Sequence, residues 1–239
     1  MFRKWYLILL FFALIGLSCD APKNNPLHSG AGSTPLVSEF NTYSIVENRF
    51  TLPKLYQFKV EAKILDPNEL VESVFVYIPY FKVKKKLSYN SSNSIYERTL
   101  TVLDLNTTKA DEVIGHEFDL LIKDKSSKTY TGSTKDIKRI IKEEIIIDSP
   151  LGYDTTETSP LLVWREFEGG FSHHYFVQVF IIHEELYPEL IWEKDNISSD
   201  SLSVKVDAVL PSGKYYWIIW CVDQFKNRAR SKEAKFNIL

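Results

Sequence analysis

The sequence lacks an apolar run long enough to cross a membrane as a helix. Such a helix needs about 20 predominantly apolar residues, whereas the longest run, residues 5–17, has 13 apolar or small residues. This run follows Arg3 and Lys4 and ends just before Cys19. A positive start and a short apolar core are typical of an export signal that is removed from the mature protein. We therefore expect an exported chain without a transmembrane helix.

The chain also lacks a strong charge of either sign. Its formal net charge is −2 at pH 7, and removal of the signal would leave 27 basic against 31 acidic residues. Nucleic-acid-binding proteins carry a basic footprint, so we expect no nucleic-acid partner. The one basic cluster contains Lys82, Lys84, Lys85 and Lys86. A solvated hairpin, or an edge strand protected by lysines, explains this cluster better than a site for an anionic partner.

Motifs for catalysis or metal binding are missing as well. The sequence has no glycine-rich phosphate loop, no nucleophile elbow and no zinc motif of the His-Glu-x-x-His type. His173 and His174 are adjacent, so their side chains would point to opposite faces of a strand. Asp66, Asn68 and Glu69 form an oxygen-rich turn that could hold calcium, but a plain turn accounts for them. We therefore expect no enzyme, no cofactor and no metal site.

The end of the apolar run resembles the lipobox of bacterial lipoproteins. In that family the cysteine is diacylated and becomes the new N-terminus after the signal is removed. The usual pattern has leucine three residues before the cysteine; here Gly16 holds that place, and Ile15 can serve as the aliphatic residue. Looser boxes of this kind are familiar in spirochaete lipoproteins. The resemblance implies a signal peptide at residues 1–18 and lipidation of Cys19; an ordinary secretory signal, with this cysteine incidental, is the alternative.

Lipidation of Cys19 would anchor the protein in the cell envelope. One acyl chain holds a protein weakly, whereas two or more anchor it stably, at about 0.8 kcal/mol per buried methylene. The resemblance favours the outer membrane, on its surface or its periplasmic face, over the inner membrane. Asp20 resembles an inner-membrane retention signal of enteric bacteria, so the choice of membrane stays open. Cys221 then has no partner for an intrachain disulfide, and we expect it to pack as a small buried apolar residue.

The remaining sequence predicts a flexible tether followed by two β-sandwich domains. Residues 19–42 are rich in Pro, Asn, Gly and Ser and have few apolar side chains to bury. Over residues 56–64, apolar residues alternate with polar or charged ones, as in a half-buried strand. Similar short strands recur, which indicates an all-β chain of antiparallel sandwiches. We place the first sandwich at residues 43–142 and the second at 143–239. Residues 136–147 are interpreted as a strand that crosses between them, with a helix as the alternative.

Residues 210–217 resemble the corner that leads into strand F of fibronectin type III and related immunoglobulin-like domains. In that family a leucine, a turn and a tyrosine form the corner, and the tyrosine hydroxyl bonds back to the chain upstream. The resemblance assigns these structural roles to Leu210 and Tyr215, and it makes Trp164 the core tryptophan of strand B. It covers residues 145–239; the first domain resembles an immunoglobulin-like sandwich more weakly.

The predicted strand F has apolar residues on both faces. Its inward face would carry Tyr215, Trp217, Ile219 and Cys221. Its outward face would carry Tyr216, Ile218, Trp220 and Val222, although the outer side of an antiparallel sandwich is usually polar. Coverage by the first domain, by a loop or by long side chains of adjacent strands would explain this face. An exposed patch at Tyr216, Ile218 and Trp220 that binds a partner is the alternative.

These features lead to a functional hypothesis with two alternatives. The leading hypothesis is a non-enzymatic lipoprotein, held in the membrane by N-terminal acyl chains, that binds a protein or another macromolecule. Loops at the ends of sandwiches are the usual recognition surfaces, and an adhesive role follows by analogy if the protein faces outward. The second hypothesis is a periplasmic structural or assembly subunit of an envelope complex. The third is an accessory glycan-binding module.

Overall fold

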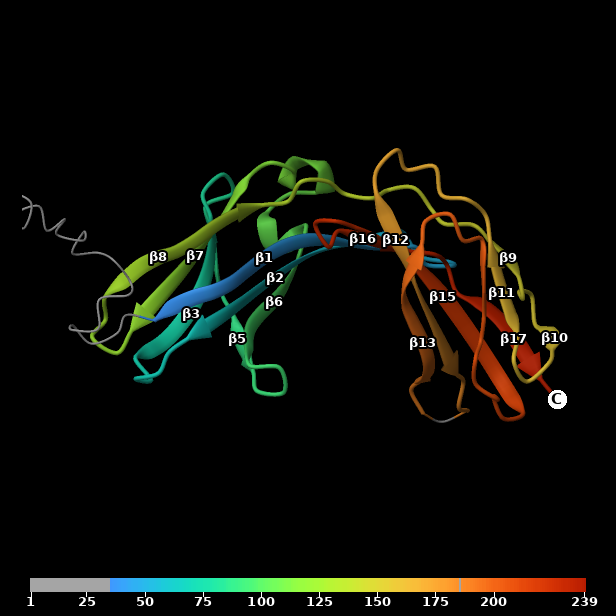
Figure 1. The fold of residues 1–239 in the computed structure, drawn as a ribbon. Helices are drawn as coiled ribbons and strands as arrows, with labels where there is room; N and C mark the ends of the chain where they lie inside the picture. Colours follow the sequence, from blue (N-terminus) through green and yellow to red (C-terminus); the bar gives the residue numbers. More distant parts are fainter. Residues whose placement is uncertain (1–34, 185) are drawn as a thin grey trace, which may run out of the picture.

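The computed structural model describes residues 35–184 and 186–239 (Figure 1). Apart from strands and loops, these residues form two short 3-10 helices, η1 (Leu103–Leu105) and η2 (Ala110–Val113). The chain is all-β and folds as two sandwiches, as the sequence predicts. In this described part, no helix has the length and hydropathy needed to cross a bilayer. The predicted signal peptide and the predicted acylation site at Cys19 lie outside the described residues.

The first sandwich has the strand order of an immunoglobulin-type domain. One sheet contains, in spatial order, β5 (Ser88–Asn90), β6 (Ile95–Thr101), β2 (Leu55–Leu65) and β1 (Leu36–Glu47). The facing sheet contains β4 (Val83–Lys86), β3 (Val71–Ile78), β7 (Glu117–Asp124) and β8 (Thr129–Asp136). In the order given, the strands of the first sheet correspond to D, E, B and A of that fold, and those of the facing sheet correspond to C′, C, F and G. The predicted alternation is present in β2, where Phe58, Val60 and Ala62 are buried between the sheets.

Strand β1 begins earlier than the sequence predicts. Residues 36–42, which we expected to end the tether, form the first half of this strand and pair with β2. The segment contains two exposed polar side chains, Ser38 and Glu39, and Phe40 is its one large buried residue. The segment therefore lacks the clear alternation of β2, and its pairing with β2 is what makes it a strand. The prediction that the tether extends to residue 42 was therefore wrong.

The crossing between the sandwiches also differs from the prediction of a strand at residues 136–147. β8 ends at Asp136, and the next strand, β9, begins at Ile147. Of the described residues between them, Ile137 makes an isolated bridge to Ile114 and the rest form no strand. The apolar character of this segment comes from isoleucines that pack into the core, such as Ile141 and Ile145, and not from strand pairing.

The second sandwich places three strands against five. The smaller sheet contains β9 (Ile147–Ser149), β11 (Leu161–Trp164) and β14 (Ser203–Lys205). The larger one contains, in order, β13 (Glu189–Ser198), β12 (His173–Ile181), β15 (Gly213–Asp223), β17 (Ala234–Ile238) and β10 (Asp154–Thr156). A further short strand, β16 (Arg228–Arg230), pairs with the other end of β15. The last strand of the sandwich is therefore divided into β16 and β17.

The core of the second sandwich forms around the residues that the family resemblance singled out. Trp164 lies on β11, the second strand of the smaller sheet in chain order, and its ring centroid is 6.5 Å from that of Trp217 on β15. Leu210 is buried just before β15. The Tyr215 hydroxyl donates a hydrogen bond to the Pro211 carbonyl at 2.5 Å. A tyrosine corner therefore stabilises the loop that enters β15.

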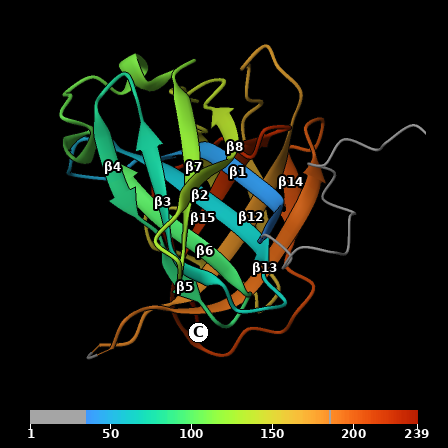
Figure 2. The ribbon, with the colours of Figure 1, turned by 90° about the vertical axis from the view of Figure 1, so that its left-hand side faces the viewer.

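The two sandwiches share one continuous sheet. β1 extends beyond the first sandwich, and its residues Ile45–Glu47 pair in parallel with Arg228–Arg230 of β16. The A-strand sheet of the first domain and the larger sheet of the second thereby form a single ten-stranded sheet. In Figure 1 the strands β1, β2 and β16 of this sheet cross the top of an arch, with one sandwich at each end. Figure 2, viewed from the side of the first sandwich, shows strands of the second behind those of the first.

A buried polar network reinforces this junction. The Ser44 backbone N–H donates to Asn227 Oδ1 at 2.9 Å, and Asn227 Nδ2 donates to Asp223 Oδ2 at 3.0 Å. Arg139 Nε lies 3.1 Å from the same Asp223 oxygen. The Ser44 hydroxyl donates to the Arg139 carbonyl at 2.9 Å. Since buried polar groups are costly when they lack partners, this network favours one relative placement of the two domains.

We predict that Asn227→Ala destabilises the protein by about 1–3 kcal/mol, because it leaves the Ser44 N–H and one Asp223 oxygen with fewer partners in a buried site. Urea unfolding at equilibrium measures the loss. Asn93→Ala is the matched control, since Asn93 is exposed in the β5–β6 turn and surface changes usually stay within about 0.5 kcal/mol. Equal unfolding midpoints for the two variants would show that the network does not stabilise the junction.

Candidate functional site

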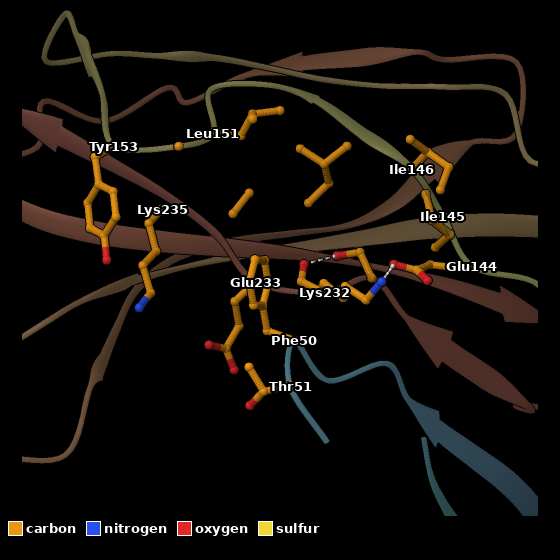
Figure 3. A pocket seen from close by; sticks show the side chains of 14 residues that line it. Phe50, Thr51, Glu144, Ile145, Ile146, Leu151, Tyr153, Lys232, Glu233 and Lys235 are labelled. Carbon is orange, nitrogen blue, oxygen red and sulfur yellow. Dashed lines mark hydrogen bonds and ion pairs between the residues drawn. The ribbon is translucent and has the colours of Figure 1, made fainter. Parts of the chain in front are cut away.

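An apolar groove lies where the two sandwiches meet. Its volume is about 570 Å³, which falls in the range of roughly 300–1,000 Å³ that ligand sites occupy. Four segments line it: residues 50–51 after β1, 144–147 leading into β9, 151–153 before β10, and 231–235, which run from the end of β16 into β17. Figure 3 shows Phe50 reaching into the groove from the loop after β1, with Leu151 and Ile146 across from it. The groove therefore needs both domains.

The break between β16 and β17 forms the floor of the groove. The side chain of Ser231 causes this break by acting as a strand partner: its hydroxyl accepts the Ile219 N–H at 3.1 Å and donates to the Lys232 carbonyl at 2.8 Å. The Ser231 N–H in turn donates to the Ile219 carbonyl at 2.8 Å. Lys232 and Glu233 are consequently exposed, and regular pairing with β15 resumes at Ala234.

The walls of the groove expose large apolar side chains. Phe50 is 78% exposed, Tyr153 is 58% exposed, and Ile146 and Leu151 are 44% and 42% exposed. Single apolar residues on a surface are common, but here four of them border one hollow. Such a gathering is typical of a surface that binds a partner or a ligand.

The charges at the groove are unevenly paired. Lys232 Nζ lies 3.2 Å from Glu144 Oε1, and Glu233 Oε1 lies 3.6 Å from Arg230 Nη1. Among the described residues, no carboxylate forms an ion pair with Lys235. Its Nζ lies 5.7 Å from the centroid of the Tyr153 ring, in a cation–π arrangement. The groove therefore carries one positive charge that no ion pair balances.

The outward residues of strand F, which we identified as a possible interface, lie on β15 outside this groove. Tyr216 stacks on Phe180 of β12 with ring centroids 4.8 Å apart. Trp220 Nε1 donates to Gln178 Oε1 at 3.0 Å. Ile218 is only 5% exposed. Of the two explanations that the sequence left open, the structure shows long side chains of an adjacent strand covering much of this face.

The other candidate groups have local roles. The lysine cluster lies on and beside β4, an edge strand, where Lys85 pairs with Asp104 at 3.1 Å. Asp66 uses both carboxylate oxygens to accept the N–H groups of Leu70 and Val71, at 2.9 and 2.7 Å. Within the described ranges, no group of three or more potential ligand side chains could hold a metal ion.

Sequence reasoning missed the groove itself. Residues 145–147 are three isoleucines at the end of the segment that the sequence assigned to the crossing between the sandwiches, but nothing in this run indicates that Ile146 is left partly uncovered. Phe50 lies in an irregular segment without alternation. An isolated aromatic residue in a turn next to a domain boundary is the one signal that could have indicated this site.

Comparisons with known proteins give weak likenesses. No protein-family model and no curated protein matches the chain. Among solved structures, the FN1–FN3 domains of chicken CNTN1 have a TM-score of 0.39 at 10% identity; the match covers 85% of this chain and 64% of that one, under two thirds of its length. The fibronectin(III)-like modules of Clostridium thermocellum CbhA have a TM-score of 0.36 at 10% identity, and the match covers 86% of this chain and 93% of that one.

A segment of two fibronectin type III domains from chicken tenascin has a TM-score of 0.27 at 14% identity, and the match covers 84% of this chain and 95% of that one. Because all these scores are low, the fold assignment rests on the strand order of the two sandwiches.

We predict that Cys221 is chemically inert in the folded protein. Burial raises the pKa of its thiol to about 12, and the nearby Asp223 carboxylate acts in the same direction. The reactive thiolate is therefore scarce at about pH 8, and a Cys19→Ser variant should react with a disulfide reagent on the order of 1,000-fold more slowly when folded than in urea. Equal rates in the two states would contradict the buried placement.

Proposed function

We propose that this chain is a membrane-anchored lipoprotein that acts as a non-enzymatic macromolecule-binding module. The observation that carries the binding role is the apolar groove at the domain junction, with Phe50 on one side and Leu151 on the other. The anchor is a separate part of the proposal. It is supported by the basic start, the short apolar run and the cysteine at residue 19, and it places the protein in the cell envelope, with the outer membrane favoured.

The arrangement of the domains suits a binding role. Both sandwiches contribute to the groove, and the shared sheet together with the Ser44–Asn227 hydrogen bond holds its two sides in register. A preorganised site binds with a smaller loss of conformational entropy than one assembled from mobile domains. The residues between Cys19 and β1 would act as the tether that separates this unit from the lipid surface.

The alternatives have less support. The structural-subunit hypothesis assigned Tyr216, Ile218 and Trp220 to a permanent interface, but side chains of β12 cover much of this face. The glycan-binding hypothesis needs an open aromatic platform, and the stacked pair of Phe180 and Tyr216 is only partly exposed. The groove therefore supports a binding module better than either alternative.

We predict that Cys19→Ser abolishes incorporation of labelled palmitate and releases the protein from the membrane fraction, because the variant has no thiol for acylation at the signal boundary. Cys221→Ser is the matched control and should retain both the label and the membrane association. Metabolic labelling followed by cell fractionation measures both. A Cys19→Ser protein that stays labelled and membrane-bound would contradict the proposed anchor.

Protease treatment of intact cells then identifies the side of the membrane that the protein faces. A known periplasmic protein serves as the control for leakage. Cleavage of the chain while the control survives favours an extracellular partner and keeps an adhesive role open. Protection until the outer membrane is permeabilised favours a partner in the periplasm and excludes an adhesin.

A further inference from the structure

The floor of the groove contains the break between β16 and β17 and the start of β17, a stretch with no strand neighbour on its outer side. β1 and β10 lie on the same side of the divided last strand, both in parallel orientation. The register of β1 ends where Glu47 meets Arg230, and that of β10 begins where Asp154 meets Phe236. In the described part of the chain, no strand pairs with residues 231–235 on this side. Residues 231–233 form no strand, and Ala234 and Lys235 begin β17. As an extended chain at about 3.3 Å per residue, these five residues would span roughly 16 Å.

The backbone at this edge is only partly used. One hydrogen bond crosses to the edge from the loop before β10: the Tyr153 N–H donates to the Lys235 carbonyl at 2.9 Å. At the other end, the Asn48 side chain and backbone N–H both donate to the Arg230 carbonyl, at 2.7 and 3.4 Å. Between these two points, a segment with its own N–H and C=O groups could extend the sheet, as in recognition by strand addition.

The surroundings define the side chains that such a segment would carry. The space between Phe50 and Leu151 is apolar, so it suits an aliphatic or aromatic side chain. Lys235 has no carboxylate partner among the described residues, whereas Lys232 is paired with Glu144. A carboxylate on the bound segment would therefore find its complement at Lys235.

We propose that this groove binds an extended segment of a partner protein, with an apolar side chain between Phe50 and Leu151 and an acidic side chain at Lys235. The proposal rests on the proposed binding function and specifies its ligand. A fatty acid would satisfy the apolar walls and the lysine, but it would leave the sheet edge at residues 231–235 without new hydrogen bonds. The structure therefore favours a peptide over a lipid.

Selection from a random-peptide phage library against the full-length protein tests this inference. We expect enriched peptides that combine an apolar residue with an acidic one a few positions away. Affinity for a synthetic copy should fall at least about tenfold in Phe50→Asp and in Lys235→Glu. Tyr89→Asp is the matched control and should bind as the unchanged protein does, because Tyr89 is 56% exposed on β5, which does not line the groove.

Two further measurements separate strand addition from other modes. N-methylation of alternate peptide residues should abolish binding, since it removes the N–H donors that pair with the sheet edge. Those amides of residues 232–235 that have no hydrogen-bond acceptor in the free protein should exchange more slowly with solvent when the peptide is bound, whereas the Ser231 amide already donates to the Ile219 carbonyl. Peptides that bind all three variants equally would overturn this site while leaving the binding function intact.

Failure to enrich any peptide over the Phe50→Asp protein would overturn the inference. Binding of dodecanoate in the groove without any peptide binder would also overturn it and would assign the groove to a lipid. Neither result affects the acylation of Cys19, which is measured separately.

Discussion

The pairing of β1 with β16 is the interaction on which the rest of the structure depends. Three residues of the first sandwich, Ile45–Glu47, join the last strand of the second and convert two sheets into one. Strand pairing alone tolerates some twist, but the buried hydrogen bonds of Ser44 and Asn227 have strict distances and angles. Together they favour a single angle between the domains.

The groove is a consequence of this junction. Phe50 follows β1 and can form a wall only because β1 ends against the second sandwich. The opposite wall follows from the chain passing from β9 in one sheet to β10 in the other. The floor follows from Ser231, whose side chain takes over hydrogen bonds that a regular strand would make with its backbone. Local chemistry and domain placement are both needed to leave this hollow.

Local signals predicted much of the fold. The alternation in β2 comes from a strand with one face in the core, and it is visible in any window of a few residues. The corner at Tyr215 is also local, because its hydroxyl bonds to Pro211 only four residues away. β1 escaped prediction over its first seven residues because their hydrogen bonds come from a neighbouring strand, β2, in which Leu65 pairs with Leu36, and Phe40 is their one large buried side chain. A strand whose hydrogen bonds and burial come from such neighbours need not show a strong pattern of its own.

The sequence by itself determined the all-β class and the two sandwiches, since both follow from periodicity and the spacing of turns. Its resemblance to fibronectin type III domains indicated the core tryptophan Trp164 and the tyrosine corner. The sequence also contains the features on which the proposed anchor at Cys19 rests. Only the tertiary structure decided that the domains share a sheet, that β12 covers the outer face of β15, and that Phe50, Ile146 and Leu151 meet around an open edge. These features depend on how segments distant in sequence are placed in space, and such placement follows from the sum of many contacts.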